Sequence, residues 1–566
     1  MRLSPTQPPA SCMSPVPDPA SHPAPTCCDP EPRVAPRVAR WAAPWTLPGR
    51  RHWPALLILA LALGLRLVGL DSKPPHFDEG VNGSFVDQMT LNGFYHYNPG
   101  NFHGPLHFYG LFLAQTLFGR HIWALRLPIA LLSTGCVGLA LMHRRHLGKT
   151  ASHIAALAMA LSPGMVFYGR YAIHETWLLF FLLLTSWGGL GLWSVGLRRH
   201  LWAVVLGLCG MVLTKETYAV HFVAIFLSIP SLLLLQTLSP SAPRPWSLPL
   251  RHWQHSDLLA ATATAFGLLV FFYSGGFLDF PSLRGLWETY ARWFATGTEG
   301  QSGHEKEWSY WLKLLLRYEW PALLGLLAAP WVLVPNKSAR IRLLAIYGLG
   351  ALCAYSLIAY KTPWCLIVLM WPFQMLFGVA IDRAFRGVDR LVTSVVSLTV
   401  LSHSYFSCFL LNFRESTNPD APYVYVQTLP ELMEKLIQPL HTLTRRDPQN
   451  YQLRGYVITA EQYPLSWLLG DFTTISYLPA DQPIETIDRP DFIIADETLA
   501  ADLEARLDAD FFKEHLKIRG NAATSEVLYL RVKAFRSCFP ERSIELVKAQ
   551  AVSPTTNTED DLGKLP

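Results

Sequence analysis

The sequence predicts a polytopic α-helical membrane protein that carries a small α/β domain at its C-terminal end. Of the 566 residues, 51% are hydrophobic and only 16% are charged, whereas an average soluble protein carries about 25% charged residues. Hydrophobic runs recur between residues 54 and 412, and they approach the ~20 residues that a helix needs to cross a bilayer. After residue 414 the sequence becomes more polar. A soluble multidomain protein is therefore excluded for most of the chain.

The first 50 residues differ from the rest because they are rich in proline. Proline removes a backbone donor and breaks helices and strands, so residues 1–50 are expected to form a disordered cytoplasmic tail. Arginines lead into the first hydrophobic run, Pro54–Leu70, which lacks a small-residue cleavage signal. We therefore expect an uncleaved first span whose N-terminal side faces the cytoplasm.

The run 105–119 decides how the remaining spans are oriented. If it crosses the membrane, the first two basic connectors, 143–149 and 198–200, face outside, against the positive-inside rule. If it lies in the outer interface, all the basic connectors face the cytoplasm, and we choose this arrangement. The transmembrane region 51–413 then has eleven expected spans, namely 54–70, 122–142, 151–168, 176–196, 201–216, 217–238, 257–273, 320–335, 342–360, 363–381 and 391–412.

This orientation gathers the ionisable groups of the span ends on the outer face of the membrane. Two of the outer loops are long, 71–121 and 274–319. The second is aromatic and contains two amphipathic stretches, Leu283–Phe294 and Trp308–Tyr318. Such stretches suit helices that lie on the membrane surface.

Residues 414–548 have the pattern of a small α/β domain, in which short strands alternate with helices. The parity of the spans places this domain outside the cytoplasm, and residues 549–566 are expected to form a flexible tail. The expected strands are Tyr423–Gln427, Gly455–Thr459, Asp491–Ala495 and Val527–Val532, and the expected helices are Leu429–Leu440 and Glu497–Asp508.

Asp78 and Glu79 are the strongest candidates for chemistry. They follow His76 and Phe77, a few residues past the first span. Adjacent carboxylates just outside a membrane suit a general base with a supporting group, or a cation site to which His103 would add a ligand. A solvated acidic pair in a loop is the alternative. We expect neither a metal nor a cofactor.

Further charged and aromatic residues stand at the outer ends of the expected spans. In a helix Arg170 and His174 would share a face, with Glu175 beside them. Lys361, close to Trp364, is placed to bind a phosphate at headgroup depth. Lipid anchoring, local ion pairs and snorkelling are the alternative roles. Together these groups predict an outer cavity in which cations hold a lipid-linked phosphate and a carboxylate activates an acceptor hydroxyl.

Several short motifs carry a resemblance to a known superfamily. They are Asp78-Glu79, His103-Gly-Pro-Leu106, Arg126-Leu-Pro128, Ser162-Pro163…Arg170…Glu175 and Leu213-Thr-Lys-Glu216. In order and sidedness they resemble the GT-C membrane glycosyltransferases, and within them the protein O-mannosyltransferase and aminoarabinose-transferase group. The Tyr360-Lys-Thr-Pro-Trp364 segment further resembles a prokaryotic, flippase-associated branch. The resemblance covers roughly residues 50–480.

The resemblance implies an inverting glycosyltransferase that takes a sugar from a polyprenyl-phosphate donor at the outer face of the cytoplasmic membrane. On this pattern Asp78 is the base for the acceptor, and Glu79 supports it or contacts the acceptor. The implied phosphate ligands are Arg126, Arg170, Lys215 and Lys361, and the implied pocket residues are His103, His107, His174, Glu175 and Trp364. The expected partners are the donor, an acceptor of unknown class and the lipid bilayer.

Two other classes of function are kept as alternatives. One is a flippase, transporter or accessory protein for lipid-linked sugars without transferase activity, and the other is a scaffold whose outer domain binds partners. Transporters keep their sites near the membrane midplane, often in repeated halves, whereas these charges lie at the outer ends and no repeat is visible. The net charge of +5 is modest and its basic residues stand in short connectors, which argues against binding of nucleic acid.

Overall fold

The computed structural model describes residues 52–538 and 545–548, with short gaps. The gaps are residues 102, 239–251, 299–302, 335–337, 461, 482–486, 521 and 523. The tails predicted at residues 1–50 and 549–566 lie outside the described residues.

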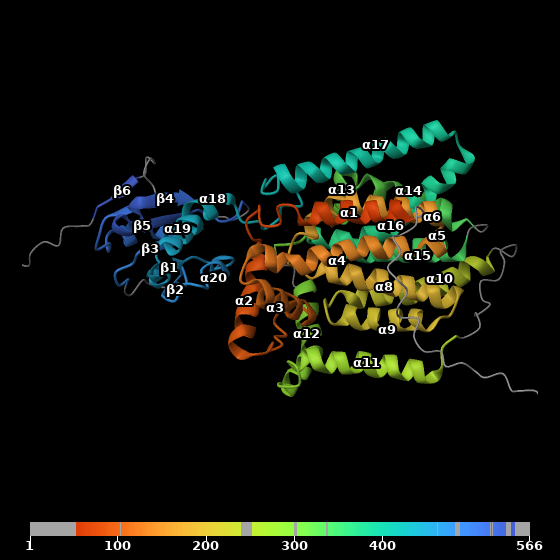
Figure 1. The fold of residues 1–566 in the computed structure, drawn as a ribbon, viewed down its shortest axis with the longest axis horizontal. Coiled ribbons are helices and arrows are strands. Elements are labelled where there is room, and N and C mark those ends of the chain that lie inside the picture. The colour runs from red at the N-terminus through yellow and green to blue at the C-terminus, as the bar shows by residue number, and fades with distance from the viewer. Residues whose placement is uncertain are drawn as a thin grey trace, which may run out of the picture. The chain divides into compact units, whose positions relative to one another are not determined.

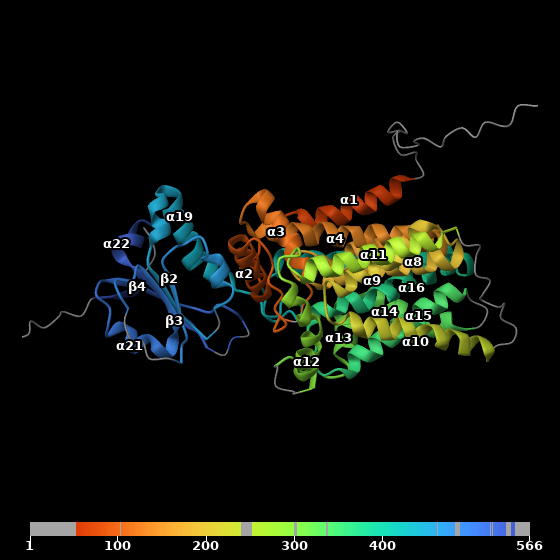
Figure 2. The same cartoon turned by 90° about the horizontal axis from the view of Figure 1, so that it is seen from below.

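A bundle of long helices forms the larger part of the described chain (Figures 1 and 2). Each of the predicted spans contains one helix of the bundle. The helix α6 ends before Ser162 and Pro163, so the predicted span 151–168 is a broken helix that continues as α7 (Pro163–Tyr168). The bundle helices are α1 (Trp53–Leu67), α4 (Ile122–Met142), α6 (Lys149–Leu161), α8 (Glu175–Ser194), α9 (Arg198–Val212), α10 (Tyr218–Thr237), α11 (His255–Tyr273), α14 (Trp320–Leu333), α15 (Ala339–Leu357), α16 (Leu366–Gly387) and α17 (Arg390–Phe409).

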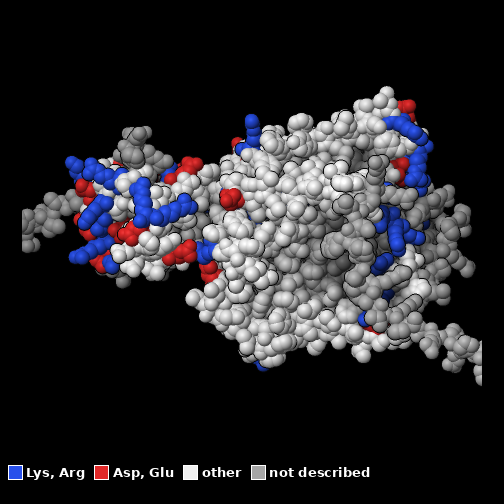
Figure 3. All heavy atoms as spheres, in the orientation of Figure 1, with Lys and Arg blue, Asp and Glu red and all other residues white. Residues whose placement is uncertain are grey.

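Seven helices in the described part of the chain are long and apolar enough to cross a membrane. They contain α4, α8, α10, α11, α15, α16 and α17. The remaining predicted spans contain helices of 13 to 15 residues, α1, α6, α9 and α14. Figure 3 shows that one face of the bundle carries few charged side chains between its two ends. The polytopic helical class is confirmed, and the count of eleven spans stays a prediction.

Helix α16 is the centre of the bundle, where all residues from Leu366 to Val379 are buried. It packs against α6, α8, α14, α15 and α17. Glycines permit the closest approaches: a Cβ atom on Gly325 of α14 would lie 1.7 Å from the Phe373 carbonyl oxygen. Close backbone contact at small residues is the packing that apolar helices use in lipid, where the hydrophobic effect does not drive helix association.

The helices α2 (Phe77–Asn92), α3 (Leu106–Phe118) and α12 (Gly285–Thr298) lie at one end of the bundle (Figures 1 and 2). α12 and α13 (Tyr310–Tyr318) confirm that the two amphipathic stretches are helical. α3 occupies the run whose interfacial position set the predicted orientation. That position stays a prediction.

Helix α2 was not predicted, because Gly80 and Gly83 disfavour a helix at this place. Two features stabilise it. A capping box at its start joins the His76 side chain to the Glu79 backbone and the Glu79 side chain to the His76 backbone. The two glycines also lie against the C-terminal domain, where an added Cβ would come within 2.5 Å of Pro464 Cα or 2.4 Å of the Trp467 ring.

The C-terminal region contains a six-stranded mixed sheet in the order β2-β1-β3-β5-β4-β6. β1 pairs in parallel with β2 and β3, and the other pairings are antiparallel. Three predicted strands correspond to β1, β3 and β5, and the predicted α/β domain is confirmed. The strands are β1 (Gly455–Ile458), β2 (Ile475–Leu478), β3 (Phe492–Asp496), β4 (Phe511–Leu516), β5 (Glu526–Arg531) and β6 (Glu545–Val547).

Helical segments precede and connect these strands. The helix predicted over Leu429–Leu440 is present as α18 (Pro430–Leu432), a π-helical turn (Met433–Ile437) and α19 (Gln438–Arg446). The helix predicted after β3 is shorter than expected and contains α21 (Ala500–Glu504). Two further short helices are α20 (Leu465–Leu468) and α22 (Val532–Phe535).

The strand predicted at Tyr423–Gln427 is wrong. Gln427 forms an isolated antiparallel bridge with His76, and Thr428 forms another with Arg519. Val426 has a φ of 57°, which interrupts an extended conformation. This segment therefore lies between the first outer loop and the C-terminal domain and does not join the sheet.

Candidate active site

A cavity of about 910 Å³ lies among the first outer loop, the ends of several bundle helices and the C-terminal domain. Six of the predicted site residues line this cavity, namely Asp78, His103, His174, Glu175, Lys215 and Trp364. Glu79, which follows Asp78 in the chain, is fully buried and does not line it. The C-terminal domain contributes Thr459, Asp496, Arg519, Thr524 and Glu526 to the wall. A cavity is therefore present where these residues meet, its position at the outer face stays a prediction, and part of its wall comes from a domain in which no site residue was predicted.

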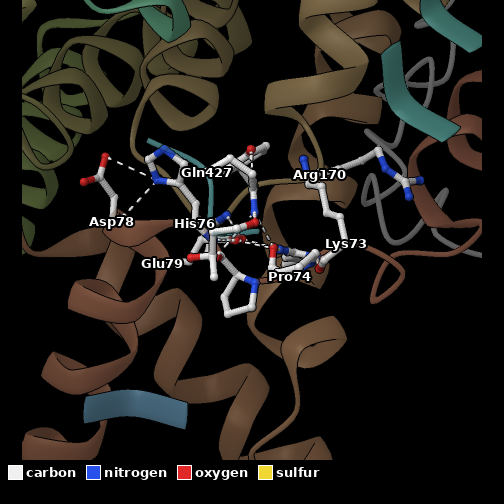
Figure 4. A network of polar contacts seen from close by, with 12 residues as sticks. Lys73, Pro74, His76, Asp78, Glu79, Arg170 and Gln427 are labelled. Atoms are coloured by element: carbon white, nitrogen blue, oxygen red, sulfur yellow. Dashed lines mark hydrogen bonds and ion pairs between the residues drawn. The ribbon is translucent and has the colours of Figure 1, made fainter. Parts of the chain in front are cut away.

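Asp78 is placed on the cavity wall by the start of α2. Its side chain is 39% exposed, and its closest ionisable neighbour is the His76 Nδ1 atom at 3.8 Å. Figure 4 shows Asp78 on one side of His76 and the cluster around Glu79 and Lys73 on the other. Among the described residues, no side chain or backbone group donates a hydrogen bond to the Asp78 carboxylate. Its oxygens are therefore available to a ligand.

His76 does not form an ion pair with Asp78, because its ring is neutral. The Nδ1 atom accepts a hydrogen bond of 3.0 Å from the Asp78 backbone N–H, and Nε2 donates one of 2.7 Å to the Tyr425 carbonyl oxygen. Burial lowers the pKa of His76 from its usual value. The histidine therefore fixes the backbone of Asp78 and leaves the carboxylate unpaired.

Glu79 is fully buried and forms a bidentate ion pair with Arg126. The guanidinium donates hydrogen bonds of 2.8 and 2.6 Å to the two carboxylate oxygens. The backbone N–H groups of His76 and Ala172 donate two more, both of 2.8 Å. Burial alone would raise the pKa of Glu79, but the charge of Arg126 outweighs it and the pKa is lowered. With both oxygens occupied, Glu79 supports the loop, and its expected alternative contact with an acceptor is not available.

Arg126 and Arg170 lie away from the cavity wall, contrary to their prediction as phosphate ligands. The remaining N–H groups of Arg126 donate hydrogen bonds to the carbonyl oxygens of Leu70, Lys73 and Pro74. The Arg170 guanidinium donates to carbonyl oxygens from Leu65 to Gly69 and so caps the end of α1. All five N–H groups of Arg126 are engaged, and Arg170 is held at the end of α1, so neither arginine faces the cavity.

Lys361 is also held away from the cavity. Its ammonium donates hydrogen bonds to the carbonyl oxygens of Lys306 and Ile358, and it is absent from the residues that line the wall. Burial lowers the pKa of this amine. Lys361 therefore ties the loop 274–319 to the end of α15, and its role as a phosphate ligand stays a prediction.

Lys215 is the predicted phosphate ligand that does line the cavity. Its ammonium lies 2.6 Å from a carboxylate oxygen of Glu175, which is the first residue of α8. Burial alone would lower the pKa of Lys215, but Glu175 and Glu216 outweigh it and hold the pKa well above its usual value. The cavity thus contains a permanent positive charge that a phosphate could share with Glu175.

Three predicted histidines form a stack beside this ion pair. The ring of His174 lies between His103 and His107, with centroid distances of 4.4 and 4.1 Å. The His103 Nδ1 atom lies 2.8 Å from a Glu216 carboxylate oxygen. His107 is buried behind the wall, where its Nε2 atom donates to the Ala172 carbonyl oxygen. Burial lowers its pKa to about 3, so His107 supports the wall as a neutral residue and does not contact the cavity.

The three predicted candidates for a cation site do not converge. Both oxygens of Glu79 are occupied by Arg126 and backbone donors, and His103 is engaged by Glu216. Of these three residues, Asp78 is the one whose side chain accepts no hydrogen bond from a described residue, so the three do not form a common cation site.

The sequence analysis missed Lys73, which lies beside this network. Its ammonium is buried over the aromatic faces of Tyr171 and Phe167, 3.4 and 3.9 Å from the ring centroids. It also missed the wall residues of the C-terminal domain. A usable signal existed for two of these, because Thr459 and Asp496 stand at the carboxyl ends of predicted strands, where ligands of parallel sheets bind.

Part of the chain matches a known family and a named protein. Residues 102–246 match the model of the dolichyl-phosphate-mannose-protein mannosyltransferase family. A segment of 76 residues is 40% identical to YkcB of Bacillus subtilis (strain 168), which is named as a candidate mannosyltransferase. That segment covers 13% of this chain and 11% of the length of YkcB.

The whole fold is similar to that of ArnT from Cupriavidus metallidurans. The ArnT structure bound to undecaprenyl phosphate matches with a TM-score of 0.58 at 14% identity, over 84% of this chain and 98% of that one. The apo structure of ArnT matches with a TM-score of 0.55 at 13% identity, over 85% and 98% of the two chains. The chain therefore has a fold similar to that of ArnT, and part of it resembles the protein mannosyltransferase family.

Proposed function

We propose that this chain transfers a sugar from a polyprenyl-phosphate donor to an acceptor hydroxyl inside the cavity. The observation that carries the proposal is the unpaired carboxylate of Asp78 on the cavity wall, in a fold similar to that of a structure bound to undecaprenyl phosphate. The other acidic residues on the bundle side of the wall, Glu175 and Glu216, are paired with Lys215 and His103.

Lys215 and Arg519 supply the positive charge for the donor phosphate in this proposal. Both line the cavity, one from the bundle and one from the C-terminal domain. Arg126, Arg170 and Lys361 are occupied elsewhere, which narrows the predicted phosphate ligands to Lys215. The outer face of the cytoplasmic membrane is the proposed location, because the basic connectors lie on the opposite side of the spans.

The proposed reaction is a single displacement. The acceptor oxygen forms a bond to the anomeric carbon while the bond from that carbon to the phosphate oxygen breaks, so the configuration inverts. The hydroxyl proton moves to Asp78, and the leaving polyprenyl phosphate keeps the electron pair. General-base catalysis of this kind accelerates a reaction by about 10²–10⁴-fold.

The test uses purified protein, a panel of undecaprenyl-phosphate-linked sugars and an envelope extract as the source of acceptor. We expect consumption of at least one donor and release of undecaprenyl phosphate, measured by mass spectrometry. Asp78→Asn keeps the shape of the side chain and removes its basicity, so transfer should slow by at least about 100-fold while donor binding persists.

Asp71→Asn is the matched control, because Asp71 is exposed in the same loop and is absent from the cavity wall. It should transfer at the wild-type rate. Equal rates in Asp78→Asn and the wild type would contradict the assignment of the base. Movement of intact donor across a vesicle, without consumption, would favour the transporter alternative.

A further inference from the structure

The C-terminal sheet meets the cavity at the point where its strand order reverses. β1 pairs in parallel with β2 on one side and with β3 on the other. The chain continues from β1 to β2 on one side and from β3 to β4 on the other, so the connections that follow β1 and β3 leave in opposite directions. In open α/β sheets, the crevice outside the carboxyl ends of two such strands is the usual place for a ligand. Here Thr459 follows β1 and Asp496 ends β3, and both residues line the cavity.

Two carboxylates stand side by side at this place. Asp496 of β3 is directly opposite Glu526 of β5 in the antiparallel register, and their exposed fractions are only 8% and 7%. Like charges directly opposite each other destabilise a sheet. Burial and the nearby Asp496 charge raise the pKa of Glu526. Asp496 caps the turn that follows β3, and Arg519 is close enough to Glu526 to lower its pKa, so the pair is held by local contacts while it lines the cavity.

The local hydrogen bonds of the pair leave acceptor capacity toward the cavity. Asp496 Oδ1 accepts from the backbone N–H and the hydroxyl of Thr498, and the Thr524 hydroxyl donates to the same carboxylate. Glu526 Oε2 accepts a bond of 3.0 Å from the Ile518 N–H. An ionised carboxylate has about four acceptor positions on its two oxygens, so each residue retains positions for further donors.

Aromatic and cationic side chains stand beside the carboxylates. The Phe77 ring lies 5.6 Å from the Tyr463 ring, and the Arg519 guanidinium lies 5.0 Å from the Phe77 centroid. All three line the same cavity. Phe77 directly precedes Asp78, so this group connects the wall formed by the sheet to the proposed base.

We infer that Thr459, Asp496, Thr524 and Glu526 form a subsite for the acceptor, and that the acceptor is a glycan. Carboxylates and threonine hydroxyls match the many hydroxyl groups of a sugar, and aromatic rings offer flat apolar faces to its C–H groups. A lipid acceptor would need an apolar wall, which these residues do not provide. The inference rests on the proposed function for its second substrate, but saccharide binding itself is independent of transfer.

The test measures saccharide binding to the full-length protein without any donor. Saturation-transfer NMR with a panel of neutral gluco-, galacto- and manno-configured trisaccharides should detect binding to the wild type. Asp496→Asn/Glu526→Gln should weaken it by at least about tenfold, because each variant loses hydrogen bonds to a charged group. Asp502→Asn, an exposed residue of α21, is the matched control and should bind as the wild type does.

The same variants are then compared in the transfer assay. The double variant should raise the KM for the acceptor and leave donor affinity unchanged, and a thermal unfolding curve matched to the wild type excludes misfolding. If the double variant does not fold, Asp496→Asn and Thr524→Val are tested singly with the same expectation. The protein could bind saccharide in a way that depends on Asp496 and Glu526 and yet consume no donor. That result would support this subsite and contradict the proposed transferase activity.

Two outcomes would overturn the subsite. One is transfer with an acceptor KM that is unchanged in the double variant. The other is the absence of saccharide binding in a wild-type protein that binds serine- or threonine-containing peptides, which would make the acceptor a polypeptide.

Discussion

At the scale of single residues, the start of α2 gives two adjacent carboxylates different environments. Asp78 and Glu79 occupy the second and third positions of the helix that His76 caps. The Glu79 side chain accepts hydrogen bonds from the His76 backbone N–H and from Arg126, whereas Asp78 lines the cavity. The positive end of the helix dipole favours the ionised form of both. Sequence neighbours thus divide into a cavity-facing carboxylate, which is the proposed base, and a buried supporting carboxylate.

Glu79→Gln is therefore expected to reduce stability more than chemistry. The variant leaves the fully buried Arg126 without its counter-charge, and breaking such a pair costs about 3–5 kcal/mol. Thermal unfolding in detergent should show a lower midpoint, with less folded protein recovered. Glu307→Gln, at an exposed ion pair with Lys313, is the control and should unfold as the wild type does. An unchanged unfolding curve combined with lost transfer would instead make Glu79 a participant in the reaction.

We expect substitutions of Lys215 and Lys361 to have different effects on the binding of the lipid phosphate. Lys215→Met removes the ammonium that lines the cavity, so the affinity for undecaprenyl phosphate should fall by at least about tenfold, as for a lost hydrogen bond to a charged group. Lys361→Met should leave the affinity unchanged, because that ammonium serves two carbonyl oxygens away from the wall. Titration of each purified variant with undecaprenyl phosphate measures both. A larger loss in Lys361→Met than in Lys215→Met would restore the role that the sequence predicted for Lys361.

At the scale of elements, buried polar contacts connect the bundle to the segment that leads into the C-terminal domain. Glu319, directly before α14, accepts hydrogen bonds from the Gly164 N–H at 2.7 Å and the Ser162 hydroxyl at 2.8 Å. The Tyr423 hydroxyl donates a third at 3.3 Å. One carboxyl group therefore joins α7, α14 and the segment before α18. Burial raises its pKa to about 7.

Glu319 should make stability fall as the pH rises. Its pKa of about 7 in the folded protein exceeds the usual 4.5, so the folded state binds the proton more tightly than the unfolded state. The stabilising contribution is complete below about pH 4.5 and is lost as the pH rises through 7, a change of about 3 kcal/mol. The difference in unfolding midpoint between the wild type and Glu319→Gln, measured from pH 5 to 8, isolates this group. A difference that does not vary with pH would contradict the assignment.

At the scale of the whole molecule, orientation in the membrane depends on whether α3 crosses it. The contacts of its loop fix where α3 begins, because the backbone N–H groups of Gly104 and Leu106 donate to carbonyl oxygens of Thr214 and Leu213 at the end of α9. That connection keeps the start of α3 at the same level as the turn between α9 and α10.

Reporter fusions test this orientation. Fusions after Lys149, Arg199 and Arg386 should report the cytoplasm, because these residues stand in basic connectors. A fusion after Gln427 should report the outer side. An outside signal at both Lys149 and Arg386 would mean that α3 spans the membrane and that the count of eleven is wrong.

The local pattern of the sequence was sufficient for the class of fold and for most elements. Hydrophobic length predicts a span regardless of its neighbours, because the bilayer itself sets the required length. The strands β1, β3 and β5 were recognisable for a different reason: each is a short apolar run that is buried in the sheet. The segment Tyr423–Gln427 does not form the predicted strand, because its aromatic side chains pack outside the sheet, Tyr423 against Tyr168 and Tyr318 and Tyr425 against His304.

The sequence by itself determined that this is a polytopic helical membrane protein, and it predicted an outer group of carboxylates, histidines and cations, Asp78 and Lys215 among them. Only the tertiary structure decided which of those groups face the cavity. Arg126, Arg170 and Lys361 have the composition of phosphate ligands, but buried carbonyl oxygens and Glu79 take their donors first. The wall formed by Asp496 and Glu526 arises from pairing between strands, which spacing along the chain does not encode. A buried hydrogen-bond donor must find an acceptor within the fold, and that requirement is met by contacts between residues far apart in the sequence.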